Sequence, residues 1–278
     1  TVERLAIECP PLPPVWPDAA RDALVALLGA GRAAVPVWDS LEAAGLIVRW
    51  FPEWEPVRYR PQRTPVHRHT VDRHQVEAAV VAASLTRRVS RPDLLLLAAL
   101  FHDLGKGGPG DHSDTGAAIV TELGGRLGLS LVDAQRLGLL VRHHLLLPAM
   151  ATRRDLDDPT TIDAVARACG SVEVLDLLAA LTEADATAAG PLAWSPMRAR
   201  LVAELVTRVR LVLGGKRFRK PPALEPAQKE LAQSTTLAVR MDLPGEPDGS
   251  CRVTVVVTGR ADALAPVAGV LAVHRLDV

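Results

Sequence analysis

The sequence predicts a mainly α-helical core that is followed by a small α+β segment. From about residue 70 to residue 213, apolar residues recur at helical spacing in one stretch after another, with short breaks between them. After Gly214 the chain becomes basic and rich in proline, and it then contains short runs of Val and Thr that favour strands. The 278 residues suffice for one large domain or two modest ones.

The N-terminal segment, residues 1–65, is punctuated by proline and is expected to be a lead-in that packs on the helical core. Between the prolines, residues 18–28 have helical spacing, with Asp18 placed as the N-cap and Gly29 as the stop. A second short helix is predicted at residues 38–44.

The core, residues 66–213, is predicted to contain seven helices. In the first of them the apolar side chains at positions 76, 79, 80, 83 and 85 form a one-sided stripe. Pro92 opens the second helix, which Gly105 ends. The predicted helices span residues 71–88, 92–104, 112–127, 131–147, 160–169, 172–188 and 197–213.

Beyond the helices, residues 214–234 are predicted to form a linker, because this stretch begins with a basic, glycine- and proline-rich run. Strands are predicted at residues 235–242 and 251–258, and a short helix at 262–271 precedes a third strand at 272–278. Three strands and one helix would form only part of the sheet of such a domain. Residues 235–278 are therefore interpreted as part of a small α+β domain.

Composition and charge exclude several classes of protein. Acidic and basic residues balance at 32 each, so no overall field favours nucleic acid or an anionic membrane as a partner. The longest apolar runs, such as residues 94–101, are too short to span a bilayer, and no secretory signal pattern opens the chain. Three scattered cysteines without a CxxC motif favour free thiols in the cytoplasm.

The strongest functional signal is the pair His102-Asp103 at the end of an apolar helix. An imidazole and a carboxylate that adjoin there can be directed at one cation, and such mixed nitrogen and oxygen ligands suit Mn, Fe, Zn or Mg. The dipeptide alone is a weak motif, since either residue is common at helix ends. Chance is a poor explanation, however, for an ordered set of such residues on consecutive helices. That set is His74, His102, Asp103, His112, His143, His144 and Asp185.

This order of residues resembles the H…HD…D signature of the HD phosphohydrolase superfamily, which has an all-α fold. The resemblance implies one divalent ion with the ligands His74, His102, Asp103 and Asp185. It also implies a second ion on additional histidines, matched by His112 and His144, with His143 as the alternative within the pair. The expected cofactor is therefore one or two ions of Mn, Mg or Fe.

A closer resemblance covers roughly residues 45–213. The blocks 66–74, 99–107, 141–146 and 181–186 look like the corresponding blocks of the bifunctional PII uridylyltransferase/uridylyl-removing enzymes (GlnD). This family implies hydrolysis of the phosphodiester that links UMP, or AMP in actinobacterial relatives, to a tyrosine of the signalling protein PII. The Arg-rich, Lys-poor composition favours an actinobacterial origin, so both leaving groups stay open.

The same family carries a nucleotidyltransferase domain before the HD domain and two ACT domains after it. The Gly-Ser and paired-Asp motif of the transferase is not found in this sequence, whereas residues 251–278 resemble the start of the first ACT domain. Where that family shows Asp-x-Pro-Gly, this chain has Arg-Ala-Asp-Ala at residues 260–263. The resemblance makes nucleotidylated PII the expected partner and glutamine the expected regulatory ligand of ACT domains.

Asp103 and Lys106 are the expected catalytic residues. The resemblance implies that Asp103 ligates the metal and orients the attacking water, and that Lys106 contacts a phosphate oxygen as a point charge. An alternative for Lys106 is a helix-end lysine that complements the helix dipole. Further metal or phosphate contacts are assigned to His143, His67, Arg142 and Arg154, for which structural or solvated side chains are the alternative.

Two other functions stay open at this point. HD enzymes also include phosphohydrolases that act on free nucleotides, although the flanking blocks and the ACT-like tail argue against them here. A non-catalytic, amino-acid-sensing regulatory module is the second alternative. Loss of a metal ligand would favour such a module, but the ligand set is intact in the sequence.

Overall fold

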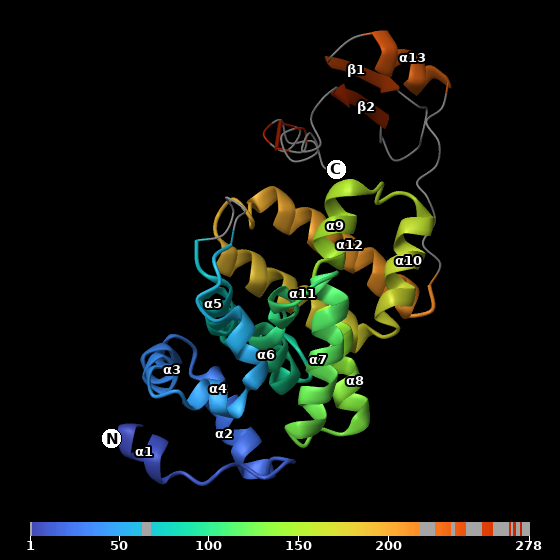
Figure 1. Ribbon diagram of the computed structural model, residues 1–278. Coiled ribbons are helices and arrows are strands. Elements are labelled where there is room, and N and C mark those ends of the chain that lie inside the picture. The colour runs from blue at the N-terminus through green and yellow to red at the C-terminus, as the bar shows by residue number, and fades with distance from the viewer. Residues whose placement is uncertain are drawn as a thin grey trace. The chain divides into compact units, whose positions relative to one another are not determined.

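A computed structural model of the chain describes residues 2–62, 68–216, 226–234, 237–242 and 252–257, with a few single positions between 267 and 273. The chain divides into two compact units, Thr1–Lys220 and Pro221–Val278. The first unit is helical throughout its described residues, and the second contains the two described strands (Figure 1). The predicted fold class, a helical core followed by a small α+β segment, is confirmed.

The lead-in consists of short helices joined by 3-10 turns. Its elements are α1 (Val2–Glu8), α2 (Asp18–Gly29), η1 (Gly31–Ala33), α3 (Ala34–Ala43), α4 (Leu46–Trp50) and η2 (Pro52–Val57). An aromatic chain joins this segment to the core, because the ring of Phe51 lies 5.3 Å from Trp16 on one side and 5.3 Å from Phe101 on the other. All three rings are buried, so they anchor the lead-in through apolar contact.

The expected caps of α2 are wrong in detail. Asp18 is the first residue of the helix, and Pro17 is the N-cap with no side-chain hydrogen bond. Asp18 instead lies in the first turn, where its negative charge complements the helix dipole, and it forms an ion pair with Arg21 at 2.9 Å. Gly29 is the last helical residue, and Ala30 caps the helix.

The core contains eight helices, of which one, an apolar helix, lies among the other seven. The eight are α5 (Val71–Leu85), α6 (Pro92–Phe101), α7 (His112–Arg126), α8 (Leu131–Arg142), α9 (Leu146–Arg153), α10 (Pro159–Cys169), α11 (Val172–Ala189) and α12 (Pro196–Leu213). Every residue of α6 from Leu94 to Phe101 is buried, and α5, α8 and α11 all contact this helix (Figure 1). A helix without a polar face must lie inside the domain, which fixes α6 at its centre.

Two predicted helices end earlier than their apolar periodicity suggests. The predicted helix at 92–104 stops at Phe101, and the chain continues through His102 and Asp103 into a 3-10 turn, η4 (Leu104–Gly107). The predicted helix at 131–147 is divided into α8 and α9 by a turn at residues 143–145. In both turns, a histidine ring nitrogen bonds a backbone carbonyl oxygen at the end of the preceding helix.

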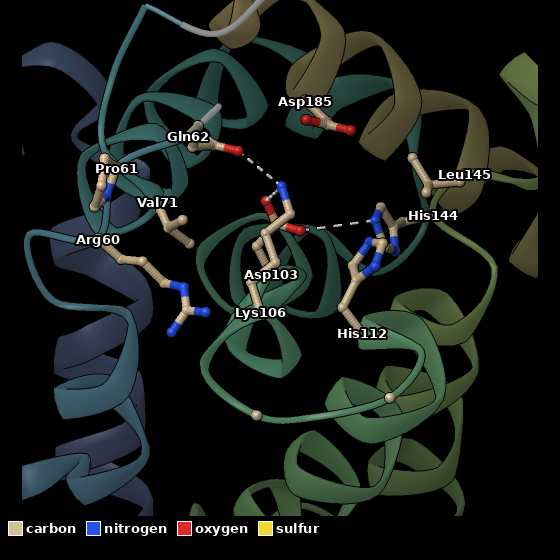
Figure 2. A pocket seen from close by; sticks show the side chains of 12 residues that line it. Arg60, Pro61, Gln62, Val71, Asp103, Lys106, His112, His144, Leu145 and Asp185 are labelled. Carbon is tan, nitrogen blue, oxygen red and sulfur yellow. Dashed lines mark hydrogen bonds and ion pairs between the residues drawn. The ribbon is translucent and has the colours of Figure 1, made fainter. Parts of the chain in front are cut away.

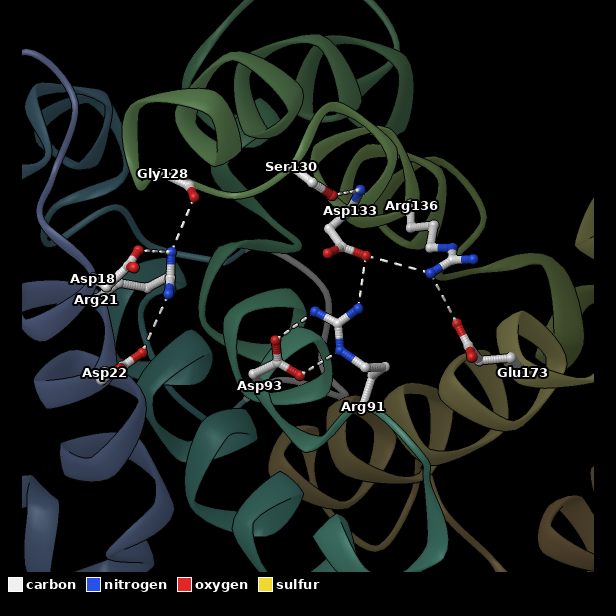
Figure 3. Close-up of polar contacts among 10 residues, drawn as sticks. All are labelled: Asp18, Arg21, Asp22, Arg91, Asp93, Gly128, Ser130, Asp133, Arg136 and Glu173. Atoms are coloured by element: carbon white, nitrogen blue, oxygen red, sulfur yellow. Dashed lines mark hydrogen bonds and ion pairs between the residues drawn. The ribbon is translucent and has the colours of Figure 1, made fainter.

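Ion pairs join the helix ends that lie away from these turns (Figure 3). Arg91, just before α6, bonds Asp93 at 2.7 Å and Asp133 of α8 at 2.6 Å, and the two carboxylates raise the pKa of the guanidinium. Arg136 of α8 then reaches Glu173 of α11 at 3.2 Å. A connected set of charges contributes more than isolated surface pairs, so this network holds three core helices in register.

The second unit begins with a helix that sequence reasoning treated as linker. That helix, α13, spans Pro226–Ser234, where Ala, Gln, Lys, Glu and Leu are good helix formers after an initial proline. The strands β1 (Leu237–Asp242) and β2 (Arg252–Val257) pair antiparallel, with Leu237 opposite Val257. The helix predicted at 262–271 and the strand predicted at 272–278 lie almost entirely outside the described residues.

Within the described residues, no helix is by itself long and apolar enough to cross a bilayer. Only α2 taken together with Gly31–Ala43 passes a test of length and composition, and this pair is bent by 110°.

The contact between α7 and α8 depends on a glycine and yields a stability test. A Cβ atom on Gly138 would lie 2.0 Å from Thr121 Oγ1 and 3.0 Å from the carbonyl oxygen of Ala117. We expect Gly138→Ala to lower the free energy of unfolding by about 1–3 kcal/mol in urea titrations, because the helices must separate. Gly125→Ala is the matched control, since its Cβ meets nothing within 4 Å, and it should stabilise by about 0.5–1 kcal/mol. Equal stabilisation by both changes would contradict this packing.

Candidate metal centre

The pair His102-Asp103 leaves the C-terminal end of α6 and is fully enclosed. His102 and Asp103 are 0% and 1% exposed. The His102 ring uses Nδ1 to bond the Ala99 carbonyl at 2.9 Å, which leaves Nε2 to face the carboxylates. The Asp103 backbone N–H donates to Oε1 of the buried Gln75 on α5 at 3.2 Å. The ring of His102 and the backbone of Asp103 are thus held in place at the end of the helix.

Helices α5 and α11 bring His74 and Asp185, respectively, next to His102 and Asp103. His74 Nε2 lies 2.8 Å from Asp185 Oδ1 and 4.0 Å from Asp103 Oδ2. His102 Nε2 lies 3.4 Å from Asp103 Oδ2 and 3.5 Å from Asp185 Oδ1. The four residues predicted as the first ligand set therefore converge, although they come from three helices and 111 positions separate His74 from Asp185.

A second ligand set shares Asp103 with the first. The ligand atoms of Asp103, His112 and His144 all lie within 4.8 Å of one another. His144 Nδ1 bonds the Val141 carbonyl, and its Nε2 lies 3.8 Å from Asp103 Oδ1 (Figure 2). Since Oδ2 of Asp103 faces the first set and Oδ1 faces the second, this carboxylate has the geometry of a shared ligand.

Gly105 allows the η4 turn, which follows Asp103, to lie close to His112 at the start of α7. A Cβ on Gly105 would lie 1.9 Å from the His112 carbonyl oxygen and 2.6 Å from the Gly116 nitrogen. Only glycine lets the η4 turn approach the backbone of α7 to this distance. The Gly of the sequence Leu104-Gly-Lys106 thus positions the second ligand set.

Opposite charges dominate the electrostatics of this cluster. Burial alone would lower the pKa of His102, but the carboxylates of Asp103 and Asp185 outweigh it and raise the pKa to about 10. Burial would raise the pKa of Asp103, yet His102 and Lys106 hold that pKa well below its usual range. His144 behaves differently, because burial and the neighbouring His102 lower its pKa to about 4.

These residues fit a divalent cation. Among the described residues, neither His102 Nε2 nor Asp103 Oδ1 has a hydrogen-bond partner, although both atoms are buried. Buried polar atoms without partners are rare in native proteins, and an absent ion is one of their recognised causes. Imidazole nitrogens and carboxylate oxygens are the ligands that Mn, Fe, Mg and Zn accept. The cluster can therefore hold a metal ion through either ligand set.

The cluster opens into a cavity of about 740 Å³ that is lined by Asp103, Lys106, His112, His144 and Asp185 on one side and by residues 60–62 on the other. The ammonium group of Lys106 lies 2.6 Å from Asp103 Oδ2 and 2.9 Å from Gln62 Oε1 (Figure 2). The ammonium group of Lys106 thus faces the Asp103 carboxylate at the edge of the cavity.

Three of the additional contacts predicted from sequence, His143, Arg142 and Arg154, do not line the cavity at the cluster. His143 and Arg142 line a separate pocket of about 250 Å³ between α7 and α8, and Arg142 forms an ion pair with Asp114 at 3.1 Å. Arg154 is exposed just after α9 and does not line the cavity. His67 lies outside the described residues. Of the adjacent histidines, His144 faces the ligand set and His143 faces away.

Sequence reasoning missed three residues that contact or border the cluster, namely Arg60, Gln62 and Gln75. Gln75 directly follows His74, so its position beside a ligand was a usable signal. Arg60 and Gln62 lie in the proline-punctuated lead-in, where no motif marks them. Tertiary packing alone brings them to the cavity.

Comparison with known proteins identifies the class first. Residues 71–190 match the HD domain family. This range begins with α5 and ends just after α11, so it encloses both ligand sets. The chain is an HD-domain protein.

The relatives define the family more narrowly. Over its whole length the chain is 47% identical to the bifunctional uridylyltransferase/uridylyl-removing enzyme of Streptomyces coelicolor and 45% identical to that of Mycobacterium tuberculosis. An enzyme of the same name from Vibrio parahaemolyticus is 32% identical over 67% of the chain and is matched over 23% of its own length. The chain spans 38% and 34% of the first two relatives, and over that segment it belongs to their family.

The adjacent histidines provide a test of the second ligand set. We expect His144→Gln to lower the Mn content of the dialysed protein, because it removes one ligand beside Asp103 while the first set stays complete. His143→Gln is the matched control and should retain the full Mn content, since its ring lines the other pocket. Elemental analysis against protein concentration measures both. Equal loss of Mn in the two variants would contradict the assignment.

Proposed function

We propose that this chain is a metal-dependent phosphodiester hydrolase that removes UMP or AMP from the modified tyrosine of PII. The observation that carries the proposal is the Asp103 carboxylate, shared by two nitrogen-rich ligand sets at the floor of an open cavity. The relatives named as uridylyl-removing enzymes support the same reaction class. The three scattered cysteines favour the cytoplasm as its location.

The chemistry of the bond explains why such a site is needed. A phosphodiester anion repels hydroxide, so hydrolysis at neutral pH requires positive charge at the nonbridging oxygens. When bound, one or two divalent ions would supply that charge and lower the pKa of water. We assign His74, His102, Asp103 and Asp185 to one ion, and Asp103, His112 and His144 to a second.

Two side chains of the cavity have further roles in the proposal. Asp103, with its backbone fixed by Gln75, orients the attacking water through a carboxylate oxygen. Lys106, held beside Asp103 and 25% exposed, presents its ammonium group to a nonbridging phosphate oxygen. Both roles need short, fixed distances, and the buried turn after α6 provides them.

The family resemblance also suggests the protein substrate of the proposed hydrolase and the ligand that would regulate it. Nucleotidylated PII is the proposed substrate, and glutamine is the proposed regulatory ligand of an ACT domain that begins within residues 235–278. The relatives are named for uridylyl removal, and AMP stays open as a leaving group beside UMP because the family resemblance implies it for actinobacterial members.

Hydrolysis of a free nucleotide is the second candidate. A cavity of about 740 Å³ falls within the range that accommodates nucleotide-sized ligands, so shape alone does not exclude it. A regulatory module without turnover is less well supported, because all six proposed ligands are present and converge.

Substrate choice can be decided with one panel. Protein loaded with Mn is incubated with UMP-modified PII, AMP-modified PII, dGTP and a cyclic dinucleotide, and released nucleotide is quantified by chromatography. We expect release from at least one PII form and none from the other two compounds. Turnover of dGTP without release from either PII form would sink the proposal.

Asp103→Ala tests the centre itself. We expect nucleotide release to fall by more than about 100-fold and metal content to fall with it, because both ligand sets lose their shared carboxylate. Helicity measured by circular dichroism should change little. Asp163→Ala, at an exposed position of α10, is the control and should keep both properties. Retained activity in Asp103→Ala would show that the centre lies elsewhere.

A further inference from the structure

The wall of the cavity opposite the ligand sets begins at an unusual backbone turn. Tyr59 has a φ of 53° and is the sole non-glycine residue with a positive φ in the described part of the chain. This conformation costs an L-residue on the order of 1–2 kcal/mol. Residues held in such conformations cluster at functional sites, where surrounding contacts enforce them.

Contacts on both sides of Tyr59 enforce the turn. The Tyr59 N–H donates to Asp72 Oδ2 at 2.8 Å, and the Val71 N–H donates to the Arg60 carbonyl at 2.8 Å. Asp72 is itself buried in the first turn of α5, and Arg58 forms an ion pair with Glu42. Tyr59 and Arg60, which follow η2, are therefore tied to α5, the helix that carries His74.

The same wall is fixed to the turn that carries Asp103. A Cβ on Gly107 would lie 2.5 Å from Pro56 Cβ, so η2 and η4 are in close contact. Gln62 accepts a hydrogen bond from Lys106 at 2.9 Å. As a result, Arg60 and Gln62 line the cavity at a defined position relative to the ligand sets (Figure 2).

Arg60 differs from neighbouring arginines in its partners. Arg58 and Arg73 pair with Glu42 and Asp39, respectively. The guanidinium of Arg60 forms no ion pair or hydrogen bond with another described residue, although it is exposed and borders the cavity. The other cation of the cavity, Lys106, already contacts Asp103 and Gln62, so it has fewer N–H groups left for a phosphate than Arg60 has.

We propose that Arg60 binds the phosphate group of the nucleotide that the enzyme removes, and the proposal rests on the hydrolase function above. A guanidinium can contact two phosphate oxygens at once, which a point charge cannot. The phosphate under attack must lie beside Asp103, and Arg60 borders the same cavity from the opposite wall. The proposed ligand of Arg60 is a nucleoside monophosphate, either within the phosphodiester or as the released product.

Product binding by matched arginine variants tests this role. Binding of UMP, AMP and inorganic phosphate to the Mn-loaded protein is measured by calorimetry for wild type, Arg60→Gln, Arg60→Lys and Arg87→Gln. Arg87 is an exposed arginine beyond the far end of α5 and serves as the control. We expect Arg60→Gln to raise the Kd of UMP or AMP by about tenfold or more, with unchanged Mn content. Arg60→Lys should recover only part of the affinity, and Arg87→Gln should match wild type.

The outcomes separate this inference from the hydrolase proposal. An unchanged nucleotide Kd in Arg60→Gln, or no binding of UMP and AMP to wild type, overturns the role of Arg60. An equal loss of affinity for inorganic phosphate identifies the phosphate group alone as the ligand feature recognised and supports the role. If wild type binds a nucleotide through Arg60 but releases none from either PII form, the hydrolase proposal fails while the role of Arg60 stands.

The left-handed turn makes Tyr59 a positioning residue with its own test. Glycine adopts a positive φ without strain, whereas a β-branched residue resists it. We expect Tyr59→Gly to keep the nucleotide affinity of wild type and Tyr59→Val to lose it as Arg60→Gln does, both with full Mn content. Equal affinity in the glycine and valine variants would show that the turn does not position Arg60.

Discussion

The burial of the Asp103 carboxylate is the constraint on which the rest of the domain depends. An isolated carboxylate removed from water costs several kcal/mol unless cations and hydrogen bonds compensate it. Here the compensation comes from His102, whose pKa the carboxylates raise, and from the ammonium group of Lys106. His102 lies at the end of α6 and Lys106 in the η4 turn, so these two elements must meet at one point for the charge to be tolerated.

The packing of α6 delivers Asp103 to that point. The helix is buried along its length, so it can shift neither toward solvent nor along its axis without exposing apolar surface. Phe51 of the lead-in packs on Phe101, the residue directly before His102. At the other end, Arg91 ties the start of the helix to α8. The lead-in and the distal ion pairs therefore both contribute to the position of the proposed metal ligands.

The sequence predicted the helical class and singled out the six side chains that converge in the cluster, because apolar periodicity and the order of His and Asp residues are local properties of the chain. It could not predict the break at residues 143–145, since apolar residues continue through the turn. Nor could spacing distinguish His143 from His144, because the choice depends on a turn that bonds Nδ1 of His144 to the Val141 carbonyl. The helix at 226–234 was missed because the basic, proline-rich run before it dominated the interpretation.

Arg60 and Gln62 show a different limit of sequence reasoning. Their place at the cavity arises from contacts of the lead-in with α5 and η4, which involve residues far apart in the sequence and carry no periodic signal. Such contributions can be recognised only when a loop is seen against the site that it borders. The same limit applies to any cavity-lining residue whose position is determined by tertiary packing rather than by a local sequence pattern.

The charges around the cavity give a reason why both walls are needed. Among the residues that line it, the formal charges of Asp103 and Asp185 are cancelled by those of Lys106 and Arg60. Histidines that ligate a metal are neutral, so a bound divalent ion leaves the cavity with net positive charge. Without the two cations, a single ion would only balance the two carboxylates. The cations of the turn and of the opposite wall would therefore give the proposed metal site a positive charge that favours an anionic substrate, as the proposed hydrolysis requires.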